Sequence, residues 1–392
     1  MKQKVFKELG TPEKRNKLTL LVVVTISVFA LMIGAGFYWA YFHQQPEKSK
    51  SGKNMGESTI VAGLQHAVDS LLRDELEMID GLQGQTIVME VQTGEILAMV
   101  GLERDFDKKY QPCANFSYQQ ELGSLTNSAS LLALFERGID SSYVVHTGKG
   151  IWVVDDNWII RDHNWRRDGY GNLNLARALE VSSSIGIGMP IWNYYKGHEE
   201  DFFDDLNKMG FGQPDFIDGI EGLKPTIYAS PKDSDWVNQF IIWSAIGYNR
   251  KIAPIQMLTF YNAIANDGKM VKPTLKTGKI EIINPHIASK DNIKKMQVIL
   301  EHVVSQGLGR KAGTPIIHVA GKTGTSQVDV SEFYVDEYQL AFCGYFPADN
   351  PKFSMIVSMN KLGLPASSGG MAGVLFHDII EWMIAHDMCQ QR

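Results

Sequence analysis

The heptapeptide Gly321-Lys322-Thr323-Gly324-Thr325-Ser326-Gln327 carries the sharpest local signal in the sequence. It follows Ile316-Ile317-His318-Val319, an apolar run that predicts the start of a strand. A phosphate-binding loop is one interpretation of Gly-Lys-Thr, but that loop needs a glycine five residues earlier, where Ile316 stands. A Gly-Thr-Ser continuation is also a poor helix start. We therefore expect a lysine and several hydroxyls on an edge strand.

Two serine-containing stretches accompany the heptapeptide. The first is Leu122-Gly123-Ser124-Leu125-Thr126-Asn127, followed by Leu132-Ala133-Leu134-Phe135-Glu136-Arg137-Gly138. In the second, Ala178-Leu179-Glu180-Val181 leads into Ser182-Ser183-Ser184. In this order and spacing, the three stretches resemble the active-site motifs of the penicillin-binding-protein transpeptidase family. Those motifs are a serine with a lysine one helical turn later, then Ser-x-Asn, then Lys-Thr-Gly.

The resemblance covers the chain from about residue 60 to 385. Four more stretches look like the family's scaffold: Thr93-Gly94-Glu95-Ile96-Leu97-Ala98-Met99, Met209-Gly210-Phe211-Gly212-Gln213-Pro214, Ile264-Ala265-Asn266-Asp267-Gly268 and Phe342-Cys343-Gly344-Tyr345-Phe346-Pro347. The resemblance implies the α+β fold of penicillin-binding proteins and serine β-lactamases, an antiparallel sheet with a mainly helical subdomain. We expect a short class B-like member, because the segment before the domain is too short for that class's N-terminal pedestal.

The resemblance also implies a role for each motif. Ser124 stands at the position of the nucleophile that attacks a D-alanyl-D-alanine stem peptide or a β-lactam, and the backbone N–H groups of Ser124 and Thr325 would hold the oxyanion. Lys322 would serve a substrate carboxylate and the second-motif serine, Ser182. The substrate-binding residues implied in this way are Lys322, Thr323, Gly324 and Thr325. No cofactor or metal is implied.

Two motif positions depart from the family. Asn127 stands where the activating lysine belongs, and Ser184 replaces the asparagine of the second motif. Asparagine cannot take a proton from serine at any useful pH, but its amide could donate a hydrogen bond to Ser124. Ser124 is then either an acylatable serine or a serine retained as a helix N-cap. Whether the protein is an enzyme stays open at this point.

Hydrophobic periodicity gives the order of elements. We expect an amphipathic helix over 59–77, strands over 86–90 and 96–100 around the turn Gln92-Thr93-Gly94, and a mainly helical middle from Ser124 to Gly268. Strands over 339–345 and 353–359 and a helix over 374–386 end the chain. Strands at both ends with helices between them predict one sheet built from distant segments.

The N-terminal region predicts a membrane anchor. Residues 18–42 form an uncharged apolar stretch that ends in aromatic residues and is long enough to cross about 30 Å of hydrocarbon as a helix. Six basic residues within 1–17 predict a cytoplasmic tail, the polar segment 43–58 predicts a stalk, and 59–388 forms the expected transpeptidase-like domain. A cleaved signal peptide is the alternative. We expect a single-pass protein of the inner (cytoplasmic) membrane, with its C-terminal domain periplasmic or extracytoplasmic.

Composition limits the remaining classes. A net charge of -6 gives no basic field for phosphates, which argues against nucleic-acid binding. The three cysteines, Cys113, Cys343 and Cys389, are far apart and suggest neither a zinc site nor a disulfide framework.

Three functions compete. The first is a catalytically impaired penicillin-binding-protein homologue of peptidoglycan synthesis that binds stem peptide, β-lactam or other cell-wall synthesis proteins. The second is an active D,D-transpeptidase or carboxypeptidase that uses Ser124 with an unconventional base, for which His146 and His163 are candidates. The third is a β-lactam sensor or β-lactamase, although no deacylating glutamate loop is recognisable.

Overall fold

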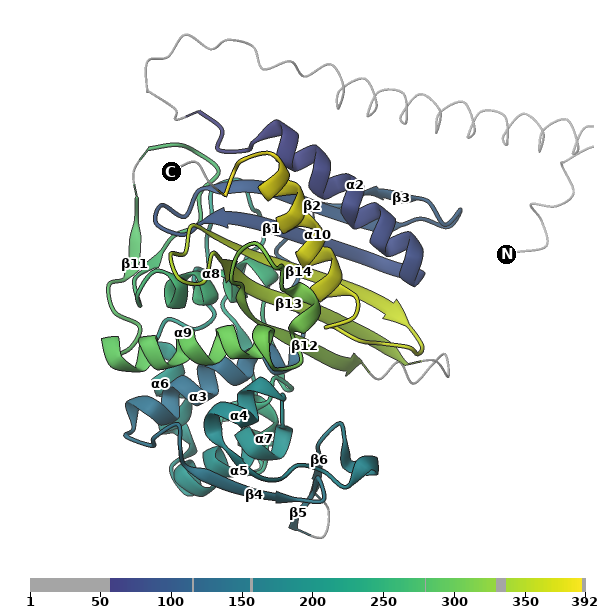
Figure 1. The fold of residues 1–392 in the computed structure, drawn as a ribbon. Helices are drawn as coiled ribbons and strands as arrows, with labels where there is room; N and C mark the ends of the chain where they lie inside the picture. The colour runs from purple at the N-terminus through teal and green to yellow at the C-terminus, as the bar shows by residue number, and fades with distance from the viewer. Residues whose placement is uncertain (1–56, 115, 156–157, 279, 329–335, 390–392) are drawn as a thin grey trace, which may run out of the picture. The chain divides into compact units, whose positions relative to one another are not determined.

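A six-stranded antiparallel sheet forms the centre of the fold in the computed structural model, which describes residues 57–114, 116–155, 158–278, 280–328 and 336–389 (Figure 1). The strand order is β12-β13-β14-β1-β2-β3. The bounds of these strands are Gly81–Glu90 (β1), Ile96–Arg104 (β2), Tyr110–Pro112 (β3), Ala320–Val328 (β12), Glu337–Phe346 (β13) and Phe353–Leu362 (β14). The first and last thirds of the chain therefore build one sheet, as the sequence predicted.

Helices cover both faces of this sheet. Helices α2 (Ala62–Ile79) and α10 (Ala372–Ala385) lie side by side on one face, and α8 (Pro254–Ala265) packs on the other (Figure 1). Alternation along β1 explains the two cores, since Val88 belongs to the cluster under α2 and α10 whereas Ile87 and Met89 belong to the cluster under α8. Edge strand β12 lies along α9 (Lys290–Ser305).

The middle of the chain forms a mainly helical subdomain below the sheet (Figure 1). Its helices are α3 (Asn127–Glu136), α4 (Leu175–Glu180), α5 (Ser184–Tyr195), α6 (Glu199–Lys208) and α7 (Phe240–Ala245). Short strands form two-stranded ladders: β4 (Val144–Gly148) with β7 (Gly171–Asn174), β5 (Ile151–Asp155) with β6 (Trp158–Arg161), β8 (Ile227–Tyr228) with β9 (Arg250–Lys251), and β10 (Met270–Val271) with β11 (Ile282–Asn284). Helical periodicity alone did not predict these ladders.

The predicted strands and helices are confirmed to within a few residues, with one exception. The run Ile316-Ile317-His318-Val319 does not start a strand, because β12 begins at Ala320. Pro315, which has no backbone N–H to give to a ladder, precedes the run, and Ile317 packs its side chain against the core under α10 instead. The prediction for this run was wrong.

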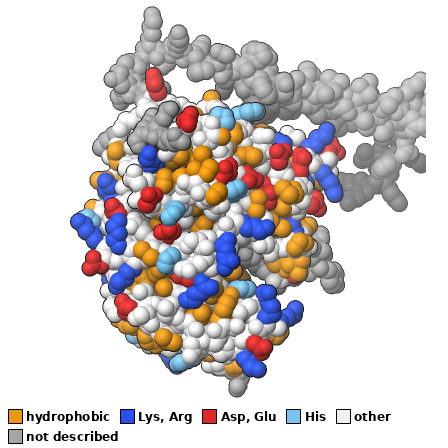
Figure 2. Space-filling model, viewed as in Figure 1, with side chains coloured by type: hydrophobic (Ala, Val, Ile, Leu, Met, Phe, Trp, Pro, Cys, Tyr) orange, Lys and Arg blue, Asp and Glu red, His pale blue; other side chains and the backbone are white. Residues whose placement is uncertain are grey.

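The predicted tail, transmembrane helix and nearly all of the stalk lie outside the described residues, so the domain boundaries stay predictions. Over the ranges that the structure describes, no helix combines the length and apolar character needed to cross a membrane. Acidic and basic side chains are interspersed on the face of the molecule shown in Figure 2.

Glycines let three backbone segments meet beside Ser124. A Cβ on Gly324 of β12 would collide with the carbonyl oxygen of Leu122, and a Cβ on Gly123 would collide with the carbonyl oxygen of Thr325. Gly247, with φ +95°, lies against the carbonyl oxygen of Gly123. The turn that carries Ser124 is thus held between β12 and the segment after α7.

We expect Gly247→Ala to lower the free energy of unfolding by roughly 2–5 kcal/mol. The cost of an alanine in the left-handed backbone conformation adds to the cost of the collision between its Cβ and the Gly123 carbonyl oxygen. Gly138→Ala is the matched control, since Gly138 has φ +84° but no atom lies within 4 Å of the position that a Cβ would take there. It should cost only about 1–2 kcal/mol. Urea unfolding of both variants checks this, and equal losses would show that the close approach at Gly247 contributes nothing.

Candidate active site

Ser124 lies in a 3₁₀ turn, Gly123–Thr126, that runs directly into α3. The turn is supported from below by Tyr261 of α8, whose hydroxyl donates to the carbonyl oxygen of Leu125 (2.8 Å). Ser124 is half-buried, and its hydroxyl has no hydrogen-bond partner among the residues that the structure describes. Because Ser124 sits inside the turn, it caps no helix, and the N-cap hypothesis for this serine was wrong.

Asn127, the first residue of α3, is completely buried. Neither its Oδ1 nor its Nδ2 has a hydrogen-bond partner within the described part of the chain. The expected amide contact to Ser124 is therefore wrong. Each unsatisfied group of a buried amide costs about 1–3 kcal/mol. The Asn127 side chain supplies neither a base nor a hydrogen bond to Ser124; only its backbone N–H donates to the carbonyl oxygen of Ser124.

Lys322 of β12 is fully buried. Its Nζ lies 2.8 Å from the Oγ of Ser182, 2.9 Å from the carbonyl oxygen of Thr323 and 3.4 Å from Thr323 Oγ1. Burial lowers the pKa of Lys322 to about 7, because the ammonium loses its hydration and no carboxylate of the described residues pairs with it. The structure thus brings two of the predicted motifs, at Lys322 and Ser182, into direct contact.

Ser182 occupies the turn between α4 and α5 and adopts the left-handed backbone conformation, with φ 53°. Asp162 holds the next residue in place: its buried carboxylate accepts from Ser183 Oγ (2.8 Å) and from the backbone N–H of Ile185 (3.0 Å). Ser183 Oγ also accepts from the N–H of Gly186 (2.8 Å), which makes it the N-cap of α5. The sequence analysis missed Asp162, since a single aspartate in a loop gives no signal.

Ser184, which stands in for the motif's asparagine, is the first residue of α5 and is half-buried. Its hydroxyl makes no side-chain hydrogen bond with any residue that the structure describes. The side chain is shorter than that of asparagine and carries no amide, so it cannot replace the amide contact to a ligand's backbone.

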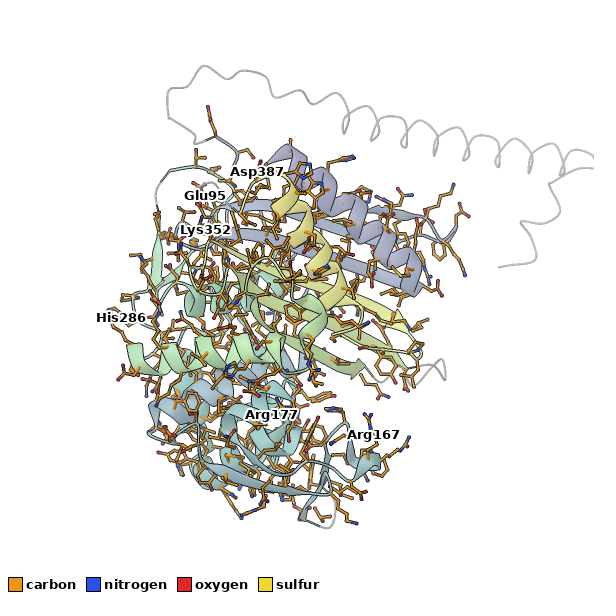
Figure 3. All side chains as sticks on the ribbon, viewed as in Figure 1. Glu95, Arg167, Arg177, His286, Lys352 and Asp387 are labelled. Carbon is orange, nitrogen blue, oxygen red and sulfur yellow. The ribbon has the colours of Figure 1, made fainter. Side chains whose placement is uncertain are left out.

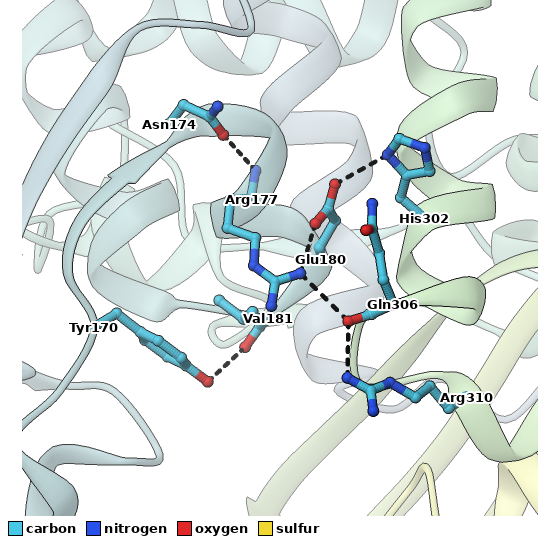
Figure 4. Close-up of polar contacts among 8 residues, drawn as sticks. All are labelled: Tyr170, Asn174, Arg177, Glu180, Val181, His302, Gln306 and Arg310. Atoms are coloured by element: carbon cyan, nitrogen blue, oxygen red, sulfur yellow. Dashed lines mark hydrogen bonds and ion pairs between the residues drawn. The ribbon is translucent and has the colours of Figure 1, made fainter.

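A second set of contacts links the residues just before the Ser182 turn to α9 and to the segment after α9 (Figure 4). The buried carboxylate of Glu180 accepts from Arg177 (2.7 Å) and lies 3.3 Å from Nδ1 of His302 on α9. Arg177 and Arg310 both donate to the carbonyl oxygen of Gln306, at 3.3 and 3.1 Å. Figure 3 shows Arg177 and Arg167 on the helical half of the domain, on its side toward the sheet. These bonds connect the second-motif turn to the segment that leads into β12.

Thr325 is engaged by a residue that the sequence analysis did not single out. Its Oγ1 lies 2.6 Å from Ser368 Oγ, and Ser368 in turn donates to the carbonyl oxygen of Gly324. Ser326 Oγ donates to the carbonyl oxygen of Glu121 (2.6 Å), just before the Ser124 turn. The third motif is thereby fixed on both sides of Gly324.

The two candidate histidines are placed differently. His163 lies in the loop after β6, with Nε2 3.0 Å from the hydroxyl of Tyr170. Burial lowers the pKa of His163, Asp162 opposes this effect, and the charges of Arg167 and Lys322 lower the pKa further. His146 lies on β4, where Nδ1 is 2.6 Å from Asn172 Oδ1 of β7. Neither histidine is hydrogen-bonded to Ser124. Among the described residues, no cluster of His, Cys, Asp or Glu could hold a metal ion.

The Ser124 turn thus lies against the Lys-Thr-Gly strand, and the second serine turn contacts the lysine of that strand. The model of the penicillin binding protein transpeptidase domain matches residues 84–381. Because this match covers most of the chain, the chain belongs to the penicillin-binding-protein transpeptidase family.

Individual relatives agree with this assignment. Penicillin-binding protein PbpB of Mycobacterium tuberculosis is 25% identical over 375 residues, covering 84% of this chain and 52% of that protein. Stage V sporulation protein D of Bacillus subtilis is 28% identical over 319 residues, covering 75% of this chain and 48% of that protein. The chain spans about half the length of these curated relatives.

Solved structures share the fold. The transpeptidase domain of penicillin-binding protein 3 from Burkholderia pseudomallei gives a TM-score of 0.71 at 24% identity and covers 87% of this chain and 100% of that one. Penicillin-binding protein 3 from Mycobacterium tuberculosis, solved in complex with aztreonam, gives a TM-score of 0.71 at 24% identity and covers 87% of this chain and 82% of that one.

The isolated amide of Asn127 predicts an unusual response to mutation. Asn127→Leu should leave the free energy of unfolding unchanged or raise it by about 1 kcal/mol, since it removes unsatisfied polar groups without opening a cavity. Asn262 offers the matched control because it is equally buried but fully bonded, to Val91 O (3.0 Å) and Ser354 Oγ (2.7 Å). Asn262→Leu should lower the free energy of unfolding by roughly 2–4 kcal/mol, because it leaves Val91 O and Ser354 Oγ without their hydrogen-bond partner.

Chemical denaturation of the two variants makes the comparison. A loss for Asn127→Leu as large as that for Asn262→Leu would show that the Asn127 amide has partners after all.

Proposed function

We propose that this protein is a membrane-anchored penicillin-binding-protein homologue of peptidoglycan synthesis that binds stem peptide or β-lactam but acylates Ser124 poorly or not at all. The observation that carries the proposal is the contrast between two buried side chains. Lys322 contacts Ser182, whereas Asn127 occupies the lysine position and its side-chain amide makes no hydrogen bond with the described residues.

The loss of chemistry follows from the nature of Asn127. A serine hydroxyl is a weak nucleophile until a base within hydrogen-bond reach takes its proton, and general-base action contributes about 10² to 10⁴ in rate. An amide cannot perform that step. The Ser124 hydroxyl has no hydrogen-bond partner in the described ranges, so no substitute base is in contact with it.

Retained binding is supported by the third motif. An ammonium on Lys322 and the hydroxyls of Thr323 and Thr325 suit a ligand carboxylate. With a pKa of about 7, Lys322 is partly neutral at neutral pH, so a bound carboxylate would favour its charged form. Aztreonam, seen bound to the related Mycobacterium tuberculosis protein, represents the β-lactam class of ligand.

The alternative, an active D,D-transpeptidase or carboxypeptidase working through Ser124, needs a base that reaches this serine. Lys322 is bonded to Ser182 and Thr323, and His163 to Tyr170. The impaired protein is therefore the better-supported function. No observation favours a β-lactamase or β-lactam sensor.

The membrane anchor over 18–42 and the periplasmic or extracytoplasmic location of the domain are part of this proposal and rest on the sequence alone. Partners among other cell-wall synthesis proteins are also part of the proposal.

Labelling with a fluorescent penicillin tests the loss of Ser124 chemistry. Trypsin isolates Ser124 in the peptide 110–137, and no adduct should appear there over hours with the wild-type protein. Asn127→Lys should begin to restore the adduct, by about 10²-fold or more, because it returns a base one turn from the serine. This variant gains a tryptic site after residue 127, so its adduct lies in 110–127.

Asn127→Met is the matched control, since methionine approaches the length of lysine but carries no amine. The double variant Asn127→Lys with Ser124→Ala should lose the restored adduct. A wild-type adduct on 110–137 would contradict the proposal.

A further inference from the structure

One serine in the pocket does have an amine beside it. Ser182 Oγ lies 2.8 Å from Lys322 Nζ, and Lys322 is fully buried. No ion pair joins Lys322 to an acidic residue anywhere in the described ranges. Ser182 is half-buried and is therefore partly exposed to solvent. A hydroxyl in contact with a desolvated amine is the arrangement that activates a nucleophilic serine.

We propose that Ser182, and not Ser124, is the activated serine of this pocket, with Lys322 as its base, and that the pair accepts an acyl or phosphonyl group from an activated ester or halide. This inference concerns the same pocket as the proposed function, but it does not require that stem peptide be the ligand.

The hydrogen bonds of Lys322 suit a base. A neutral amine has two N–H donors and one lone pair. The carbonyl oxygen of Thr323 at 2.9 Å and the hydroxyl of Thr323 at 3.4 Å can accept the two donors. In the structure, Nζ donates to Ser182 Oγ; in the neutral amine the lone pair would instead accept the hydroxyl proton of Ser182. With a pKa of about 7, the neutral amine makes up about half of the population at neutral pH, so no ligand is needed to create it.

The contact is held rigidly from two directions. On the C-terminal side of Ser182, Asp162 fixes the neighbouring Ser183 through the bonds to Ser183 Oγ and the Ile185 N–H. On the N-terminal side, the Glu180 carboxylate is bonded to Arg177, and the backbone carbonyl oxygen of Glu180 accepts from the N–H of Leu308 (3.1 Å). Ser182 itself keeps a left-handed conformation that is unfavourable for a residue with a side chain. Fixed geometry of this kind reduces the entropic cost of a nucleophilic attack.

The step balances without a further reactant. Neutral Lys322 takes the hydroxyl proton as Ser182 Oγ forms a bond to the electrophilic carbon or phosphorus. The bond from that atom to its leaving group breaks, and the leaving group departs as an anion or takes the proton from Lys322. For a fluorophosphonate, an O–P bond forms, a P–F bond breaks and fluoride leaves.

A fluorophosphonate carrying a fluorophore tests this inference on the purified full chain. Trypsin separates the two serines, because Ser182 lies in the peptide 178–196 and Ser124 in 110–137. The label should appear on Ser182 in 178–196, and its rate should rise with pH through about 7 and then level off as Lys322 loses its proton.

Ser182→Ala and Lys322→Met should each reduce labelling by about 10²-fold or more. Ser305→Ala, at the exposed end of α9, is the control and should label at the wild-type rate. Thermal melting of every variant establishes that it is folded. If a substituted protein does not fold, the labelled peptide and the pH dependence of the labelling rate in the wild-type protein are enough to test the inference.

Label confined to 110–137, or no label on either peptide, would overturn the inference. Absence of label from both peptides would leave the proposed function intact, because that function depends on reversible ligand binding. Label on Ser124 would contradict the proposed function as well, so the two failures are distinguishable.

Discussion

Backbone contacts that only glycine permits determine the geometry of this pocket. Gly324 lies against Leu122, Gly123 against Thr325, and Gly247 against Gly123, so that the third-motif strand, the Ser124 turn and the segment after α7 meet without intervening side chains. A Cβ at any of these positions would push the segments apart. The positions of the Ser124 and Thr325 backbone N–H groups and of the Lys322 side chain all depend on this close approach.

The chemistry of the pocket has changed while this framework has remained. Replacing lysine by Asn127 removes a base from the first motif and leaves a buried amide without partners in the described chain. The third motif keeps its lysine, and the bonds of Asp162 and Glu180 keep Ser182 against it. Under the proposed binding role, Lys322 stays in place although the first motif lacks its base, and Lys322 contacts a different serine, Ser182.

Sequence reasoning predicted one sheet built from both ends of the chain, a mainly helical middle and the order of the motifs, because periodicity and motif spacing report on burial and on chain order. It failed where the outcome depended on tertiary contacts. It could not foresee that the Asn127 side chain makes no bond to Ser124, that Asp162 holds Ser183, or that Ser368 bonds to Thr325, since each of these depends on residues brought together by folding. Pro315 is a sequence signal that β12 begins after the apolar run, because proline cannot donate a backbone hydrogen bond to a ladder.

Reversible binding of an acetylated peptide that ends in D-alanyl-D-alanine tests the central claim most directly. Titration calorimetry in buffers of different ionisation enthalpy measures both affinity and proton uptake. Because Lys322 has a pKa of about 7 in the empty pocket and a carboxylate favours its charged form, binding at pH 8 should take up roughly one proton per site, and affinity should fall as the pH rises from about 7 to about 9. Lys322→Met should abolish the proton uptake and most of the affinity. Absence of binding, or binding that is the same in Lys322→Met, would contradict the view that the pocket is kept to hold a carboxylate ligand.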